Sequence, residues 1–314
     1  MSKARKLVSV LGSGRIGAAV AHQLAMRGIC DLRLLDIIEG LPQGEALDIT
    51  QMISEMGIDV DVSGSNDFHD LAGSEIVVVT AGLPRKPGMT RMDLLEKNSV
   101  IIHDVAGKIA EFAPDSKLLM VTNPMDVMTY LAFKVTGFQR ERVVGMGGML
   151  DVSRFTSILA QRLQVSRASI SAMVIGEHGE TMIPLPRFST VNGNRVSDIL
   201  SKEQLAEAIE GTRKVAIEVI AKKGATVFAP TYCVAVMVDS MLRDRRLVQP
   251  CSVYLNGEYG GVRDIFIGVP VVLGAAGVEK IIELPLDTDE KALFAKCVET
   301  LRAAISSLGP KLLG

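Results

Sequence analysis

A histidine set among glycines and acids is the first candidate for chemistry in this sequence. The segment Gly176-Glu177-His178-Gly179-Glu180 follows Ile170–Ile175, an apolar run typical of a buried strand. Glycines at a strand end suit a cleft better than a packed core, so we expect His178 to face one. An imidazole titrates near neutral pH, which suits it to take and return a proton during catalysis. His178 is therefore the candidate proton carrier.

Two charged residues upstream could complete such a site. Asp151 and Arg154 are three residues apart in Met149–Leu163, which has a helical pattern, so they share a face. A carboxylate could fix the tautomer of His178 and stabilise the imidazolium. A guanidinium could hold a substrate carboxylate with two parallel hydrogen bonds. A plain surface ion pair has the same spacing, and spacing alone does not choose between them.

A glycine-rich turn near the start of the chain is the strongest local motif. Gly12-Ser13-Gly14-Arg15-Ile16-Gly17 follows the apolar run Leu7–Leu11, opens a helical pattern, and is followed by Asp36 at the end of the next apolar run. A strand, a glycine turn, a helix and a later acid in this order predict a dinucleotide-binding site. A glycine turn with an unrelated acid is the alternative.

Each residue of that motif has a predicted role toward a dinucleotide. Gly12 permits the tight turn, Gly14 lets the backbone approach a pyrophosphate, and Gly17 lets helix and strand pack closely. The helix N-terminus offers free N–H donors to the phosphates. Asp36 would bind the ribose hydroxyls and repel a 2′-phosphate, which favours NAD over NADP. Arg15 could lie along the pyrophosphate or point to solvent, and the sequence leaves both open.

A cationic loop follows the apolar run Ile76–Thr80. Residues 81–91 contain Arg85, Lys86 and Arg91 together with two prolines and two glycines. The loop leaves the carboxyl edge of the predicted sheet, where open α/β folds bind ligands. A solvated surface loop is the alternative reading. Its position and charge favour a loop that closes over an anionic substrate and excludes water.

The elements that must position these residues alternate between short apolar runs and amphipathic helices in the first half. This pattern predicts βαβ crossovers and an α/β fold, a Rossmann-type doubly wound parallel sheet, over residues 1–146. The expected strands are Leu7–Leu11, Leu32–Leu35, Val60–Val62, Ile76–Thr80, Leu118–Val121 and Val143–Val144, and the expected helices include Ile16–Arg27, Gln43–Met56 and Asp93–Phe112.

The rhythm changes after about residue 145, and residues 147–314 predict a mixed α/β substrate domain. Ser201 and Gln204 form a capping-box pattern at the start of a long helix. The expected elements are the helices Met149–Leu163, Ser201–Lys222 and 289–308, and the strands Ile170–Ile175, Phe188–Val191, Ser252–Leu255 and Ile265–Val272.

Composition excludes several classes of function. The 314 residues are 48% hydrophobic with a formal net charge of -2, and aromatic residues make up 4%. A nucleic-acid partner would need a basic face, and base stacking would need more aromatics. The four cysteines are scattered, and no metal-ligand spacing is present. The longest apolar stretch, Ile265–Val278, is broken by glycine and proline, so we expect no membrane span and a cytoplasmic protein.

Five motifs in order resemble the lactate/malate dehydrogenase family, and within it the lactate-dehydrogenase-like malate dehydrogenase branch. The likeness covers nearly the whole chain. Besides the glycine turn with Asp36, the motifs are Gly82-Leu83-Pro84-Arg85-Lys86-Pro87-Gly88-Met89-Thr90-Arg91, Val121-Thr122-Asn123-Pro124, Leu150-Asp151-Val152-Ser153-Arg154-Phe155 and Gly176-Glu177-His178-Gly179. The chain departs from common family patterns at Glu180, where relatives often carry Asp, and at Val152-Ser153.

The resemblance implies an NAD-dependent dehydrogenase that moves a hydride to or from a small 2-hydroxy acid. By that resemblance, His178 and Asp151 form the proton relay, Arg154 holds the C1 carboxylate, and Arg91 polarises the substrate carbonyl once the loop closes. Asn123 would lie between the nicotinamide ribose and the substrate oxygen.

The same resemblance places Asn98 near the cofactor, and Arg15 and Ile16 are counted among the cofactor-binding residues. It also implies a homodimer or homotetramer.

Arg85 addresses which 2-hydroxy acid reacts. The matching family position faces the substituent on C3, where lactate-specific members resemble one another in carrying Gln. A second carboxylate needs a cation there and a methyl group does not. Arg85 therefore favours (S)-malate and oxaloacetate as a dicarboxylate substrate pair. The alternatives are a lactate dehydrogenase or broader 2-keto acid reductase, and a catalytically silent NAD-binding protein.

Overall fold

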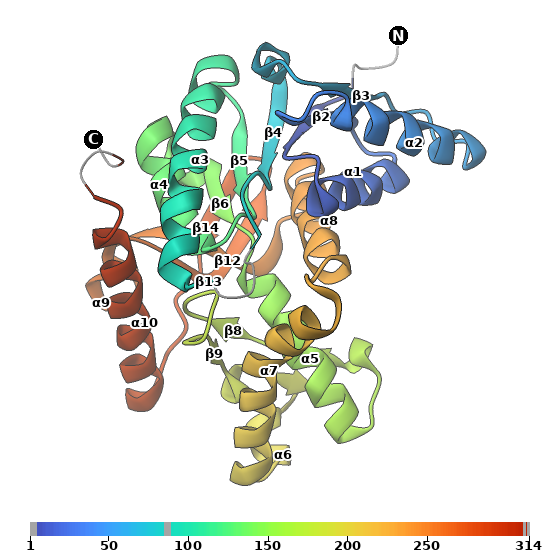
Figure 1. Ribbon diagram of the computed structural model, residues 1–314. Helices are drawn as coiled ribbons and strands as arrows, with labels where there is room; N and C mark the ends of the chain where they lie inside the picture. The colour runs from blue at the N-terminus through green and yellow to red at the C-terminus, as the bar shows by residue number, and fades with distance from the viewer. Residues whose placement is uncertain (1–4, 85–88, 310–311, 313–314) are drawn as a thin grey trace.

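One twisted sheet runs through most of the molecule. The computed structural model describes residues 5–84, 89–309 and 312. Its largest sheet has nine strands in the order β14-β13-β12-β6-β5-β4-β1-β2-β3 (Figure 1). The part from β3 to β6 is parallel and has the strand order of a Rossmann fold, which confirms the predicted fold class.

Most of the six parallel strands form because they are short apolar runs that can be buried on both faces. The edge strand β3 is the exception, since it is mostly polar and only partly buried. Their bounds are β1 (Leu7–Leu11), β2 (Asp31–Leu35), β3 (Val62–Ser65), β4 (Ser74–Val79), β5 (Lys117–Met120) and β6 (Val143–Gly145). The expected strand Val60–Val62 is wrong in extent, because β3 begins at Val62 and runs on to Ser65. The pairing of β2 with β3 begins at Val62, and Val60 is buried outside the strand.

Helices cover both faces of this parallel sheet. On one side lie α1 (Arg15–Arg27) and α2 (Leu41–Glu55), with α8 (Phe228–Leu242) of the second half packed on α1. On the other lie α3 (Arg91–Phe112) and α4 (Met125–Thr136), with α10 (Thr288–Ser306) packed on α4 (Figure 1). Pro42 occupies the first turn of α2, where its missing N–H costs no helical hydrogen bond.

The second half of the chain extends the sheet of the first. Ser252 of β12 (Leu247–Asn256) pairs antiparallel with Gly145 of β6. A Cβ at position 145 would lie 2.9 Å from the Cβ of Ser252, so glycine allows this contact. The hairpin partner β13 (Arg263–Gly274) and then β14 (Gly277–Ile281) complete the sheet, with the short α9 (Glu258–Gly261) between β12 and β13.

The remaining elements form a lobe below the sheet. They are α5 (Gly148–Leu163), β7 (Ile170–Ser171), β8 (Val174–Ile175), β9 (Ile183–Pro184), β10 (Thr190–Val191), β11 (Asn194–Arg195), α6 (Val196–Ile199) and α7 (Lys202–Lys223), with the 3-10 turns η3 (Arg167–Ser169) and η4 (Pro186–Phe188). Two further 3-10 turns, η1 (Phe68–Leu71) and η2 (Arg140–Arg142), lie in the first half of the chain, before β4 and before β6. The expected capping box of Ser201 and Gln204 is present at α7.

Two expected strands of this lobe are wrong in extent. Ile170–Ile175 divides into β7 and β8, which belong to different sheets: β7 pairs with β10, and β8 pairs with β9. Phe188 ends a 3-10 turn, so only Thr190–Val191 remains extended as β10.

All four cysteines are buried and free.

No single helix in the described part of the chain is long and apolar enough to cross a membrane. By length and composition α7 and α8 pass that test as a pair, with a bend of 119° between them.

Candidate active site

The structure brings His178 and Asp151 together. His178 follows β8 and Asp151 lies in the first turn of α5, and the ring Nδ1 is 2.8 Å from Oδ2 of Asp151. The other oxygen, Oδ1, accepts from Arg154 at 2.8 Å, one helical turn further along α5. The side chain of Asp151 is only 2% exposed, so this is no surface ion pair. The shared face predicted for Asp151 and Arg154 is confirmed.

A glycine lets the imidazole lie against the start of α5. A Cβ at Gly147 would be 2.8 Å from the Cβ of His178, closer than atoms pack. The chain therefore enters α5 directly under the histidine, and Asp151 is one turn away. Because Nδ1 bonds to Asp151, Nε2 is the ring nitrogen that can reach a substrate.

The surroundings of His178 act on its charge in opposite directions. Burial lowers the pKa of an imidazole by disfavouring the cation, and Arg154 lowers it further. The charge and hydrogen bond of Asp151 raise it, with a smaller contribution from Asp126. The net pKa of His178 is raised above its ordinary value, so the imidazolium persists to a higher pH than in a free histidine.

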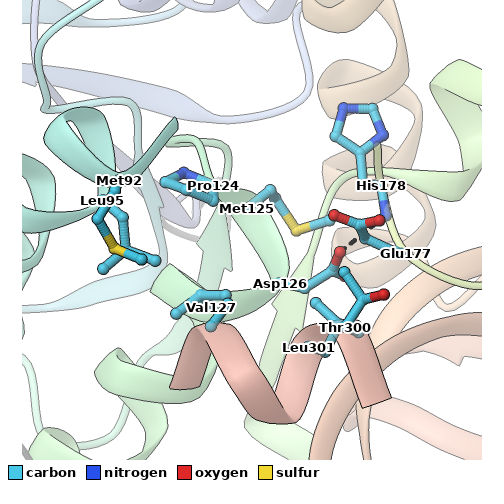
Figure 2. A pocket seen from close by; sticks show the side chains of 11 residues that line it. Met92, Leu95, Pro124, Met125, Asp126, Val127, Glu177, His178, Thr300 and Leu301 are labelled. Atoms are coloured by element: carbon cyan, nitrogen blue, oxygen red, sulfur yellow. Dashed lines mark hydrogen bonds between the residues drawn. The ribbon is translucent and has the colours of Figure 1, made fainter. Parts of the chain in front are cut away.

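A further carboxylate, which the sequence analysis did not identify, lies behind His178. Asp126, in the first turn of α4, accepts a 2.7 Å hydrogen bond from the backbone N–H of His178. Figure 2 shows Asp126 and Glu177 grouped below the imidazole. Both line a cavity of about 110 Å³. The sequence offered a weak signal: Asp126 lies two residues after the motif Val121-Thr122-Asn123-Pro124.

The glycine turn has a shape that fits a dinucleotide. Gly12 has φ +94°, and a Cβ at Gly17 would lie 1.7 Å from the carbonyl oxygen of Gly12. The fold itself therefore requires glycine at these two positions. At Gly14 a Cβ would meet nothing within 4 Å, so the protein's own packing does not require glycine there. A glycine that faces open space at a helix N-terminus leaves room for a pyrophosphate to approach the backbone.

Asp36 lies beside this turn, directly after β2. Its Oδ2 accepts from the backbone N–H of Ser13 at 2.6 Å, and its Oδ1 accepts from Ile38 at 3.0 Å. The carboxylate is thus held at the mouth of the turn, where the ribose hydroxyls would lie. Arg15, which the sequence left undecided, is exposed at the start of α1, and Ile16 packs against the core.

Asn98 joins the cationic loop to the neighbouring strand end. It is buried on α3, where its Oδ1 accepts from Leu83 N at 2.7 Å and its Nδ2 donates to the carbonyl of Asn123 at 2.7 Å. The side chain of Asn123 is exposed at the carboxyl edge of the sheet. Arg91 is the first residue of α3, and Arg85 lies outside the described residues.

Comparison with known proteins decides the family. The model of the lactate/malate dehydrogenase NAD-binding domain matches residues 6–145. The model of the lactate/malate dehydrogenase alpha/beta C-terminal domain matches residues 148–309. The chain belongs to the lactate/malate dehydrogenase family. The resemblance found in the sequence motifs is confirmed, and this dehydrogenase is an NAD-dependent oxidoreductase.

Relatives of this dehydrogenase match over nearly their whole length. A malate dehydrogenase from Roseiflexus sp. (strain RS-1) is 45% identical over 97% of this chain and 99% of its own. The solved malate dehydrogenase from Aeropyrum pernix is 42% identical with a TM-score of 0.95, covering 98% of this chain and 100% of that one. A lactate dehydrogenase from Cryptosporidium parvum, in complex with lactic acid and NAD, is 36% identical with a TM-score of 0.94, covering 98% of this chain and 99% of that one.

Proposed function

We propose that this dehydrogenase interconverts (S)-malate and oxaloacetate with NAD. The observation that carries the chemistry is the buried hydrogen bond between His178 and Asp151 with Arg154 on the same carboxylate. The similarity to malate dehydrogenases at 42–45% identity supports the substrate. Arg85, which the sequence places in the cationic loop, supports a second carboxylate on the substrate.

In malate oxidation, Nε2 of His178 would take the hydroxyl proton as the hydride leaves C2. Asp151 stabilises the resulting imidazolium and holds the ring in the tautomer that presents Nε2. Arg154 would bind the C1 carboxylate, and Arg91 would polarise the oxygen on C2. Bound NAD supplies the acceptor of the hydride.

The residues that would hold NAD lie along one edge of the sheet. Gly12, Gly14 and Gly17 with the backbone of Arg15 and Ile16 would receive the pyrophosphate, and Asp36 the adenosine ribose. Asn123 would contact the nicotinamide ribose, and Asn98 would keep Asn123 in place through the 2.7 Å bond to its carbonyl.

Oxidation of NADH on adding oxaloacetate tests the proposal directly. We expect a kcat/KM for oxaloacetate at least about tenfold above that for pyruvate, since a charge-assisted hydrogen bond contributes about 1.5–3 kcal/mol. A preference for pyruvate would indicate a lactate dehydrogenase or broader 2-keto acid reductase. No turnover of either would indicate a silent NAD-binding protein.

Replacement of Arg85 by Gln tests the specificity. The ratio of kcat/KM for oxaloacetate to that for pyruvate should fall about 10- to 100-fold, because the C4 carboxylate loses its cationic partner. Lys86→Gln removes an equal charge from the same loop and is the control. An equal change of the ratio in both variants would assign the effect to the net charge of the loop and contradict a specific role for Arg85.

Replacement of Asp36 by Asn tests the cofactor preference. The amide oxygen can still accept from Ser13 N–H, so the glycine turn keeps its 2.6 Å bond, while the negative charge and the bond accepted from Ile38 N–H are lost. Discrimination between NADH and NADPH, measured as the ratio of their kcat/KM values, should weaken about tenfold or more because the 2′-phosphate is no longer repelled. An unchanged ratio would remove Asp36 from cofactor recognition.

A homodimer or homotetramer and a cytoplasmic location are further parts of this proposal. They rest on the family resemblance and on the composition of the sequence.

A further inference from the structure

Asp126 is a buried acid that is not part of the proton relay formed by His178 and Asp151. It is only 3% exposed, and burial raises the pKa of its carboxyl to about 6. A carboxylate in such a place costs free energy unless its interactions offset the loss of water. The apolar side chains of Leu95, Val127 and Leu301 line the same cavity (Figure 2).

Among the described residues, the main contacts of Asp126 are with His178, and no ion pair joins Asp126 to an arginine or lysine. Its Oδ2 accepts from the backbone N–H of His178 at 2.7 Å. Its Oδ1 is buried without a hydrogen bond in the described structure, as is Oγ of Ser252. The serine hydroxyl faces the carboxylate closely enough to lower its pKa.

We propose that Asp126 is a positioning residue for His178, holding its backbone while Asp151 holds its ring. The inference rests on the proposed function, in which His178 carries the proton. The two acids come from different elements, α4 and α5, and they reach the histidine at two atoms, N and Nδ1. Fixing both atoms leaves the direction of Nε2 little freedom, which is what proton transfer to a bound substrate needs.

The charge of Asp126 also acts on the imidazolium. Asp126 is one of the groups that raise the pKa of His178, after Asp151. The titratable groups that face Asp126 are His178 and Glu177 from the segment after β8, and Cys297 of α10. Above about pH 7 Asp126 is ionised and supports the imidazolium; as the pH falls through about 6 it takes up a proton and this support is lost.

Two substitutions separate the hydrogen bond from the charge. Asp126→Asn keeps an oxygen that can accept from His178 N–H and removes the charge, whereas Asp126→Ala removes both. The chain has four histidines, so the imidazole carbon-bound proton signals can be followed by NMR, and His178 is the one missing in His178→Asn. This measures the pKa of His178 without any enzyme assay.

We expect Asp126→Asn to lower the pKa of His178 by about 0.5–1 unit. The pH at which oxaloacetate reduction declines should move down equally, with little change in kcat at pH 6, where the wild-type carboxyl is itself half protonated. Asp126→Ala should in addition lower kcat about 10- to 100-fold at an unchanged KM for NADH. Asp239→Asn is the matched control: Asp239 is also 3% exposed, but it pairs with Arg245.

The proposal would be overturned if folded Asp126→Asn left the pKa of His178 unchanged and Asp126→Ala kept the wild-type kcat. If neither variant folds, Ser252→Ala decides. It removes the hydroxyl that faces Asp126 and lowers the pKa of its carboxyl, so the pKa of Asp126 should rise and that of His178 should fall. An unchanged pKa of His178 in this variant would overturn the proposal. A wild-type protein that turns over neither oxaloacetate nor pyruvate would contradict the proposed function, while the NMR titration would still report on Asp126.

Discussion

Replacing His178 with Asn is expected to lower kcat for oxaloacetate reduction by about 10²- to 10⁴-fold, because the variant has no group that can deliver a proton near neutral pH. The Asn side chain can still donate to Oδ2 of Asp151, which in the wild type accepts from Nδ1 of His178 at 2.8 Å. The buried carboxylate therefore keeps a partner, and the fold should survive.

Stopped-flow binding of NADH separates this loss from a structural one. The Kd of NADH should stay near the wild-type value, since His178 is not among the close neighbours of Gly12 and Gly17 or the hydrogen-bond partners of Asp36. His22→Asn on α1 is the control and should keep wild-type kcat. Loss of NADH binding in His178→Asn would identify His178 as a structural residue and contradict the proposed relay.

Replacing Asp151 with Asn is expected to lower kcat/KM for oxaloacetate by about 10²- to 10⁴-fold, because the imidazolium loses its buried counter-charge and the ring its fixed tautomer. Asp151 is also the group that raises the pKa of His178 most. In the variant, burial and Arg154 lower that pKa without this opposing charge.

The sign of the pH effect follows from the direction of the reaction. Oxaloacetate reduction needs the imidazolium, which in the wild type persists above the ordinary pKa of histidine. The reduction rate of Asp151→Asn should therefore decline at a lower pH than that of the wild type, as measured by kcat/KM from pH 5 to 9. An equal loss of rate at every pH, with no shift of the decline, would mean that Asp151 does not act on the charge of His178.

Local sequence determined much of the cofactor half. A strand that ends at Leu11, the glycine turn and Asp36 are close along the chain, and each follows from short-range geometry or from period-two and period-3.6 patterns. Gly17 is required by its contact with the carbonyl oxygen of Gly12, five residues earlier, whereas Gly12 is also confined by Thr80 and Ala81, directly after the neighbouring strand β4. The Rossmann strand order follows from repeated βαβ units, for which few connections are sterically allowed.

Other elements could not be predicted from the sequence pattern because of how they are buried or paired. Ten of the fifteen residues of α8 are buried, most of them apolar or small, so α8 lacks the amphipathic period by which a surface helix is predicted. The run 170–175 looks like one strand by composition, but Leu185 N bonds to the carbonyl of Met173 and the chain changes sheets there. Which neighbour a short strand pairs with is a tertiary property that its own residues do not encode.

The sequence by itself determined that His178 is the histidine suited to a cleft, and that the chain binds a dinucleotide. Only the tertiary structure decided what surrounds that histidine. Asp151 is 27 residues away and Asp126 is 52 residues away along the chain, and both contact it within 2.8 Å. Residues so far apart in the sequence come into contact only because β8 and the helices α4 and α5 pack together. The charge of His178 depends on that packing, because burial and nearby carboxylates set a pKa and residue order does not.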